Sequence, residues 1–366
     1  MAIEAVEVFK RFLTRGNVSL DTLPPLEGAL LPNNDLEQAR EHPAGRLEQP
    51  NSLHVDARGV WVASRDLLVQ AAPGASRWTT VAHLPSAVTA MAPIGQSWLI
   101  ATTADGLFLL GADGGVLQRL EEPGLMPGCV TDLAVGANGD LYAAVGSRSI
   151  VASDWHVDLM QKAATGSIWT RPGLVGEWRL VLDNLAWPAG LDVSDGTLTY
   201  TEAWAHRVMQ MDLDTPGRPR VLARNLPGYP GRIRAAEGSG FWLCVFAMRT
   251  QLVEFVLTQD DYRRTMMAEI DPRFWLRPAL RTLNTGLVPL QGGGIKKLGQ
   301  TKPWAPPRSY GLVVHLDDGG EVTRSFHSRA GGSKHGVTGV AEFGGELVAC
   351  AQGGDAVLIL GKVSKR

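Results

Sequence analysis

The chain has 366 residues, and its 35 lysines and arginines nearly balance its 37 aspartates and glutamates. This balance gives no broad electrostatic attraction to nucleic acid or to an anionic membrane surface, so we expect neither as a partner. The three cysteines, Cys129, Cys244 and Cys350, cannot all pair with one another, and each lies in or beside an apolar run. We therefore expect buried free thiols in a protein of a reducing compartment.

The N-terminal stretch MAIEAVEVFKRFL predicts a short amphipathic helix within residues 1–23. Ile3, Val6, Phe9 and Leu13 fall on one face of this helix, and we expect that face to pack on the fold; a membrane or a partner protein is the alternative. Charged residues interrupt the apolar positions, so the stretch is not typical of a secretory signal. No other stretch is long and apolar enough to span a bilayer, so we expect a cytoplasmic protein without a transmembrane segment.

From residue 50 onward, one unit recurs six times: an apolar strand, a tight turn that ends in glycine, and a second apolar strand. Clear copies are LHVDARGVWVAS, LDVSDGTLTYTEA and VAEFGGELVACA. Such a turn needs a positive φ, which glycine adopts without a Cβ clash. The turn glycines are Gly59, Gly95, Gly139, Gly196, Gly240 and Gly345. Further strand-like runs follow most copies, so each repeat supplies about four strands, which make one propeller blade.

We therefore predict an all-β fold, a six-bladed β-propeller that forms a single domain over residues 1–366, with its blades in residues 50–362. Two separate β domains are the alternative, and the spacing of the glycines fits them less well. Residues 149–172 and 262–309 interrupt this spacing. The longer insertion falls in the fifth blade, contains a predicted short helix and a glycine-rich loop, and is expected to act as a lid. A segment around residues 40–48 is expected to complete the last sheet and close the ring.

The innermost strands of a propeller line its central channel, so their first residues are expected to meet at one mouth. Residues at equal distances on either side of a hairpin turn lie at the same end of the hairpin. Counting from the turn glycines places a set of polar side chains at this mouth: Asn51, Thr131, Asp132, Glu202, Arg232, His335 and Thr338. Trp204 follows Glu202 in TEAWAHRV, a polar and aromatic end of a strand.

Structural roles are the alternative for each of these residues. Asp132 could bond to backbone amides at the channel end, and Arg232 could balance Asp132 or Glu202 in a buried ion pair. His335 in SKHGVTG could be an exposed loop residue. The other histidines show no metal-ligand spacing, and neither GYPGR nor GSKHG is a nucleophile elbow.

The segments LDNLAWPAGLDVSDGTLTYTEAWAHRV, NLPGYPGRI and KPWAPPRSYGLVV resemble the strictosidine synthase-like branch of the six-bladed propellers. This branch is related to paraoxonase, gluconolactonase and the senescence marker proteins, and the resemblance covers residues 50–362. It implies small-molecule chemistry at the central mouth. In most relatives this is hydrolysis of lactones or esters, and in the plant synthases it is condensation of an amine with an aldehyde.

The hydrolytic relatives hold a catalytic calcium ion, and the resemblance places its ligands at Asn51, Thr131, Ala189 and Gly231–Arg232. None of these residues carries a carboxylate, and an arginine stands at the last position. Calcium takes six or more oxygen ligands, and a fixed positive charge within the cage opposes it. We therefore expect no metal and no other cofactor. The glutamate base of the plant synthases matches Thr338, so that reaction is not supported either.

Three functions remain open. The first is a metal-independent hydrolase of an ester or lactone, with Glu202, Asp132 or His335 as acid–base groups and Arg232 orienting a substrate carboxylate or an oxyanion. Further substrate contacts are expected from Asn51, Thr131, Trp204 and Thr338. The second is a carbon–nitrogen bond-forming lyase that uses Glu202. The third is a propeller that binds an anionic small molecule without converting it. The sequence determines neither the substrate nor the oligomeric state.

Overall fold

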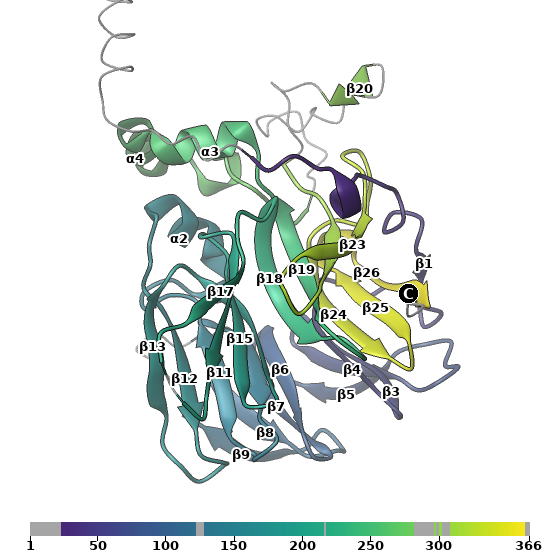
Figure 1. Cartoon of the computed structure of the whole chain (residues 1–366). Helices are drawn as coiled ribbons and strands as arrows, with labels where there is room; N and C mark the ends of the chain where they lie inside the picture. The colour runs from purple at the N-terminus through teal and green to yellow at the C-terminus, as the bar shows by residue number, and fades with distance from the viewer. Residues whose placement is uncertain are drawn as a thin grey trace, which may run out of the picture.

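The computed structural model describes residues 23–121, 128–215, 217–281, 296–297, 300–301 and 308–362. It confirms the all-β, six-bladed propeller: six four-stranded antiparallel sheets follow one another along the chain (Figure 1). The first blade contains β2 (Pro50–Asp56), β3 (Gly59–Ser64), β4 (Leu67–Ala71) and β5 (Thr79–His83). The second contains β6 (Val88–Ile94), β7 (Ser97–Thr102), β8 (Leu107–Leu110) and β9 (Val116–Leu120). The third contains β10 (Val130–Val135), β11 (Leu141–Val145), β12 (Gly166–Arg171) and β13 (Arg179–Leu185).

The remaining three blades complete a closed ring. The fourth contains β14 (Pro188–Ser194), β15 (Thr197–Glu202), β16 (Arg207–Asp212) and β17 (Arg220–Ala223). The fifth contains β18 (Gly228–Ala235), β19 (Phe241–Met248), β22 (Leu312–Leu316) and β23 (Val322–His327). The sixth contains β24 (Val337–Phe343), β25 (Glu346–Ala351), β26 (Ala356–Lys362) and the N-terminal β1 (Arg40–Glu41). The innermost strands contact one another in the order β2, β6, β10, β14, β18, β24 and back to β2.

The N-terminal segment closes the ring, as the sequence predicts. Strand β1 pairs antiparallel with β26, with Arg40 opposite Ile359, beside the C-terminus in Figure 1. The pairing continues past the strand, because the His42 amide donates to the Val357 carbonyl at 2.8 Å. The last blade therefore borrows its outermost strand from the start of the chain, which covers an edge that would otherwise be open.

The turn glycines behave as the repeat pattern predicts, since all six have positive φ. At Gly59, with φ of 121°, an added Cβ atom would lie 2.1 Å from the Ala71 carbonyl oxygen. At Gly240, with φ of 76°, it would lie 2.1 Å from the Leu316 carbonyl oxygen. Glycine at these turns thus permits both the backbone conformation and the close approach of the next strand.

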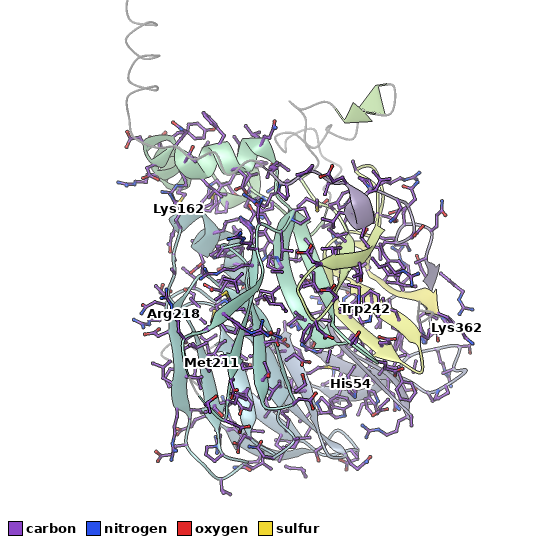
Figure 2. All side chains as sticks on the ribbon, viewed as in Figure 1. His54, Lys162, Met211, Arg218, Trp242 and Lys362 are labelled. Atoms are coloured by element: carbon purple, nitrogen blue, oxygen red, sulfur yellow. The ribbon has the colours of Figure 1, made fainter. Side chains whose placement is uncertain are left out.

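Apolar side chains fill the spaces between neighbouring blades (Figure 2). Trp61 and Trp98 pack between the first two blades with ring centroids 4.8 Å apart, and Trp242 packs between the fifth and sixth. All three cysteines are buried, as expected, and Cys244 and Cys350 are free thiols. Burial raises the pKa of the Cys244 thiol to about 12, so this thiol is poorly reactive.

Both insertions connect the second strand of a blade to its third. Helix α2 (Trp155–Gln161) lies between β11 and β12, and helices α3 (Gln251–Thr258) and α4 (Asp260–Glu269) follow β19. The longer segment spans residues 249–311 and also contains the two-stranded hairpin of β20 (Lys296–Lys297) and β21 (Gln300–Thr301). It starts earlier than the expected residue 262. The shorter insertion is narrower than expected, because β12 falls within residues 149–172.

The insertions lie at the mouth end of the channel. A second strand ends where the first strand of the same blade begins, so every connection from second to third strand lies at that end. Figure 1 shows α2, α3 and α4 gathered at one end of the molecule. Short 3₁₀ helices also occur: Gly28–Leu30, Ala152–Asp154, Pro272–Phe274 and Gln352–Gly354.

The predicted N-terminal helix falls almost wholly within residues 1–22, outside the described residues. Within the described ranges, no helix has the length and apolar character that a membrane crossing requires.

Candidate functional site

Each innermost strand has a β-bulge near its first residue. The register between first and second strand shifts at the same position in all six blades. The residues within the shifts are Asn51, Thr89, Thr131, Ala189–Gly190, Gly231–Arg232 and Thr338. A bulge leaves residues unpaired and turns their groups out of the ladder, and bulges are frequent next to active sites. Here the six bulges surround the channel mouth.

Arg232 occupies the centre of this ring of bulges. Its side chain is buried, and its Nη1 donates to the Thr338 carbonyl at 2.7 Å and to the Asn51 carbonyl and Oδ1, both at 3.2 Å. Its Nη2 donates to the carbonyls of Thr89 at 2.5 Å and Thr131 at 3.0 Å. One arginine of the fifth blade thus bonds to the backbone of blades one, two, three and six. Arg232 thus lies at the channel mouth, and its predicted role in substrate binding stays a prediction.

The fifth N–H of Arg232 is directed to Asp132. Nε donates to Asp132 Oδ1 at 3.2 Å, and Asp132 also accepts from Arg234 at 2.8 and 2.9 Å and from the Leu191 amide at 3.0 Å. Asp132 is fully buried. Both structural alternatives for these residues are therefore present: Asp132 bonds to a backbone amide, and Arg232 balances it. Arg234, which lies two residues after Arg232 on the same strand face, was missed, although the alternation in GRIR could have revealed it.

The central position does not fit a calcium ion. Its four backbone carbonyls already accept hydrogen bonds from a guanidinium, and the buried carboxylate beside it faces two arginines. Over the described ranges, no three histidine, cysteine, aspartate or glutamate side chains cluster as a metal site would require. A calcium ion at this point would meet a fixed positive charge instead of vacant oxygen ligands. That the protein uses no cofactor stays a prediction.

A pocket of about 300 Å³ opens above Arg232. Its lining combines the ring residues with an aromatic wall and with residues of both insertions: Gln49, Asn51, Ala87, Val88, Thr89, Thr103, Thr131, Ala152, Ser153, Trp155, Trp187, Ala189, Arg232, Phe246, Leu280, Thr338 and Gln352. Trp155 meets Phe246 edge to face at 5.4 Å, and Trp187 stacks on Trp204 at 5.3 Å. Trp204 therefore supports the wall from behind and does not itself line the pocket.

Most polar groups at the base of the pocket are already bonded within the protein. Asn51 Nδ2 donates to the carbonyls of Val88 and Thr89, Thr131 Oγ1 to Pro188, and Thr338 Oγ1 to Pro50. Thr89 Oγ1 is buried and lacks a hydrogen-bond partner among the described residues. Thr89 was missed in the sequence, although it stands six residues before Gly95 much as Thr338 stands seven before Gly345.

Glu202 lies outside the pocket lining. Its carboxylate is buried and accepts from Arg207 Nε at 2.8 Å, from Arg207 Nη2 at 2.6 Å and from the Ala186 amide at 2.9 Å. The residue is thus placed in an ion pair within the fourth blade. Its predicted catalytic role stays a prediction, and it needs the carboxylate to leave these partners.

His335 is also bonded away from the pocket lining. Its Nδ1 lies 2.8 Å from Ser309 Oγ, and its Nε2 lies 2.9 Å from the Arg329 carbonyl. Burial lowers the pKa of this imidazole, so it is neutral at physiological pH. Of the predicted site residues, the structure brings Asn51, Thr131, Arg232 and Thr338 together in the lining. Asp132 lies directly beneath them.

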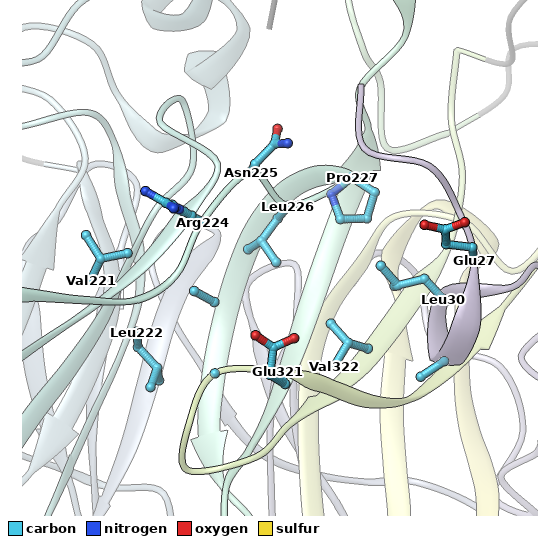
Figure 3. Close-up of a pocket in the computed structure, with 13 residues that line it drawn as sticks. Glu27, Leu30, Val221, Leu222, Arg224, Asn225, Leu226, Pro227, Glu321 and Val322 are labelled. Atoms are coloured by element: carbon cyan, nitrogen blue, oxygen red, sulfur yellow. The ribbon is translucent and has the colours of Figure 1, made fainter. Parts of the chain in front are cut away.

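A larger hollow of about 710 Å³ lies on the outer side of blades four and five (Figure 3). Its walls are β17, the loop of residues 224–227, the turn before β23 and the segment that contains Glu27 and Leu30. It is far from the bulge ring in the fold, because β17 and β23 are the outermost strands of their sheets. The mouth pocket is therefore the candidate site.

No protein-family model matches the chain. The protein named strictosidine synthase-like 13 of Arabidopsis thaliana is 28% identical over 176 residues, which cover 46% of this chain and 42% of that protein. The chain is similar to the strictosidine synthase-like propellers. The matched part spans less than half of that plant protein.

Longer alignments relate the chain to animal proteins. Adipocyte plasma membrane-associated protein of Danio rerio is 24% identical over 339 residues, covering 86% of this chain and 75% of that protein. The human protein of the same name is 24% identical over 349 residues, covering 88% and 78%.

Solved structures share the fold. A calcium-binding regucalcin from Agrobacterium tumefaciens has a TM-score of 0.55 at 16% identity, covering 85% of this chain and 84% of that one. A gluconolactonase from Xanthomonas campestris has a TM-score of 0.56 at 11% identity, covering 87% of each chain. At these identities the likeness establishes the propeller architecture alone.

Proposed function

We propose that the protein binds a small, mainly apolar molecule in the mouth pocket and needs no calcium to do so. The observation that carries this proposal is the guanidinium of Arg232, which uses its N–H groups on four ring carbonyls and Asp132. The guanidinium of Arg232 thus takes the place of a bound calcium ion. The aromatic wall of Trp155, Trp187 and Phe246 offers a ligand its largest apolar contact.

Hydrolysis of an ester or lactone is the second candidate, and the relatives support it. Small-molecule enzymes use this architecture, since the solved neighbours include a gluconolactonase and a luciferin-regenerating enzyme. Among the described lining residues, however, there is no carboxylate and no histidine. Thr89, whose buried hydroxyl has no hydrogen-bond partner among the described residues, is one of the polar residues of the lining. Glu202, Asp132 or His335 would have to change partners to act as the base.

A carbon–nitrogen bond-forming reaction has less support. Thr338, at the position matched to the glutamate of the plant synthases, does line the pocket. Its hydroxyl already donates to the Pro50 carbonyl at 3.2 Å, and a threonine does not exchange protons as a carboxylate does.

A binding measurement with a neutral aryl probe tests the pocket. We expect 2-naphthylacetamide to bind, and we expect Trp155→Ala to weaken its affinity by about tenfold, because the substitution removes part of the aromatic wall. Trp78→Ala is the control, since Trp78 donates to the Gly45 carbonyl and neither residue belongs to the lining. Equal losses in both variants, or no binding to the wild type, would contradict the proposal.

Metal content and turnover separate the two candidates. We expect elemental analysis to find no stoichiometric calcium, and a chelator to leave thermal unfolding unchanged. Turnover of lactones or aryl esters that resists the chelator and disappears in Glu202→Gln or His335→Gln would establish the hydrolase. Stoichiometric calcium with chelator-sensitive turnover would reject the metal-independent site.

A further inference from the structure

The second half of the fifth-blade insertion is strongly basic. Residues 271–308 contain one acid, Asp271, and seven basic residues, an excess of six positive charges in a chain whose net charge is −2. The basic residues are Arg273, Arg277, Arg281, Lys296, Lys297, Lys302 and Arg308. Leu280 of this segment lines the mouth pocket. An excess of positive charge concentrated in such a segment indicates a partner with negative charge.

Two of these arginines are neutralised by nearby carboxylates. Arg273 pairs with Asp271 at 2.8 Å, and Arg281 pairs with Asp355. Arg277 and Arg308 have no carboxylate within ion-pair distance among the described residues. They donate to backbone carbonyls instead: Arg277 to Pro272 and Pro278, each at 3.1 Å, and Arg308 to Arg277 at 3.3 Å and to Arg273 at 3.1 Å.

The remainder of the segment contains no carboxylate for this pair. Residues 282–307 contain no aspartate or glutamate, so the segment itself has no further side chain of negative charge. Both Arg277 and Arg308 are half-buried, where an uncompensated charge is costly. A guanidinium matches the geometry of carboxylate and phosphate oxygens and binds them through paired hydrogen bonds.

The arginine pair lies at the rim of the mouth pocket. Leu280, three residues after Arg277, lines the pocket together with Ser153 and Trp155. His156 packs edge-on against Trp155 and Trp275, each at 5.9 Å, and burial together with the charges of Arg277 and Arg308 lowers its pKa to about 4. Burial and repulsion from Arg308 lower the pKa of Arg277 to about 10, against a weaker attraction from Asp154. The hydrogen bond from Arg308 Nε to the Arg277 carbonyl holds the two arginines together, and His156 packs on Trp275, two residues before Arg277.

We infer that Arg277 and Arg308 form an anion subsite at the rim, and that the ligand joins a carboxylate or phosphate group to an apolar body that packs on the aromatic wall. This inference rests on the proposed function of the mouth pocket and adds the charge of its ligand. It also gives a negatively charged ligand a different partner from Arg232, whose N–H groups are all directed at the protein.

Calorimetric titration of the full chain with three matched probes tests the inference: 2-naphthylacetate, 2-naphthyl phosphate and the neutral 2-naphthylacetamide. We expect wild-type protein to bind at least one anion about tenfold more tightly than the amide. In the Arg277→Gln/Arg308→Gln double variant we expect that preference to disappear, while the affinity for the amide stays the same. Arg273→Gln is the control, because Asp271 already neutralises Arg273.

The outcomes are distinguishable. The wild-type comparison needs no substitution, so it decides the point even if the double variant fails to fold. Equal affinity of wild type for anions and amide, or a preference that survives in the double variant, overturns the subsite and leaves the pocket intact. Binding of none of the probes overturns the proposed function itself. Arginine-dependent sedimentation with phosphatidylserine vesicles, without binding of the small anions, assigns the pair to a membrane surface and rejects the subsite.

Discussion

At the scale of single residues, Arg232 combines two properties that usually exclude each other. It is a buried charge, and burial lowers its pKa from the ordinary value, yet an arginine remains protonated at physiological pH. Such a charge is tolerated only when it is paired and hydrogen-bonded. Asp132 provides the pairing, and the ring carbonyls exposed by the bulges accept the remaining donors.

Removal of this guanidinium is expected to weaken the whole ring. Arg232→Met leaves the ring carbonyls and part of Asp132 without donors, so we expect the free energy of unfolding to fall by about 3–5 kcal/mol. Urea unfolding followed by tryptophan fluorescence measures this change. The matched control is Arg65→Met, whose ion pair with Glu48 is exposed and contributes about 0–1 kcal/mol. Similar losses in the two variants would show that Arg232 does not hold the blades together.

At the scale of elements, the blades are regular sheets whose exceptions lie at their ends. Every innermost strand carries its bulge at the mouth, and the last sheet takes its outer strand from the start of the chain. Side chains reinforce this closure: Arg46 donates to the Gly354 carbonyl at 2.6 Å, and Lys334 pairs with Glu41. The innermost strands β14 and β18 also approach each other closely at Gly190, where an added Cβ atom would lie 2.4 Å from the Gly231 carbonyl oxygen.

A single backbone donor can test the closure. His42→Pro removes the amide that bonds to Val357, whereas His42→Ala removes the same side chain and keeps that amide. We expect the proline variant to be less stable than the alanine variant by about 1–3 kcal/mol, and more prone to aggregate because the edge of β26 is exposed. Urea unfolding and light scattering measure the two effects. If the two variants behave alike, the ladder at residue 42 contributes nothing to closure.

At the scale of the whole molecule, charge is unevenly distributed along the chain, because residues 271–308 have an excess of six positive charges in a chain whose net charge is −2. Buried histidines add a dependence on pH. Burial lowers the pKa of His327 to about 4, partly offset by Asp35 and a backbone carbonyl, and burial together with Arg249 lowers that of His206 to about 3. In the unfolded chain these groups regain the ordinary pKa of about 6.5.

Stability is therefore expected to fall with acidification. Between pH 6.5 and 4 the unfolded chain binds protons that the folded chain does not, so the free energy of unfolding is highest above pH 6.5. It falls by up to about 1.4 kcal/mol per pH unit for each such histidine. Urea unfolding at pH 7.5, 6 and 5 measures the slope. We expect His327→Gln to reduce this slope by the contribution of about one histidine, and the exposed His83→Gln to leave the slope unchanged. A free energy of unfolding that does not change with pH in the wild type would contradict this account.

The local pattern of residues was sufficient to predict much of the fold. Alternating apolar residues around six glycines predicted the number of blades, and counting from those glycines placed Asn51, Thr131, Arg232 and Thr338 at one mouth. Both signals are short-range, because a hairpin is specified by its own turn and periodicity.

Only the tertiary structure decided how these residues pair. Arg232 bonds to Asp132 across 100 residues of sequence, and Glu202 bonds instead to Arg207, its neighbour on the next strand. The pattern of apolar residues does not indicate where each β-bulge lies, so Thr89 was not predicted as a residue of the mouth. The sequence by itself determined the architecture and the end of the channel that holds the candidate site. The partner of each charged side chain depends on which blades meet across the axis, a distance over which the local pattern of residues contains no information.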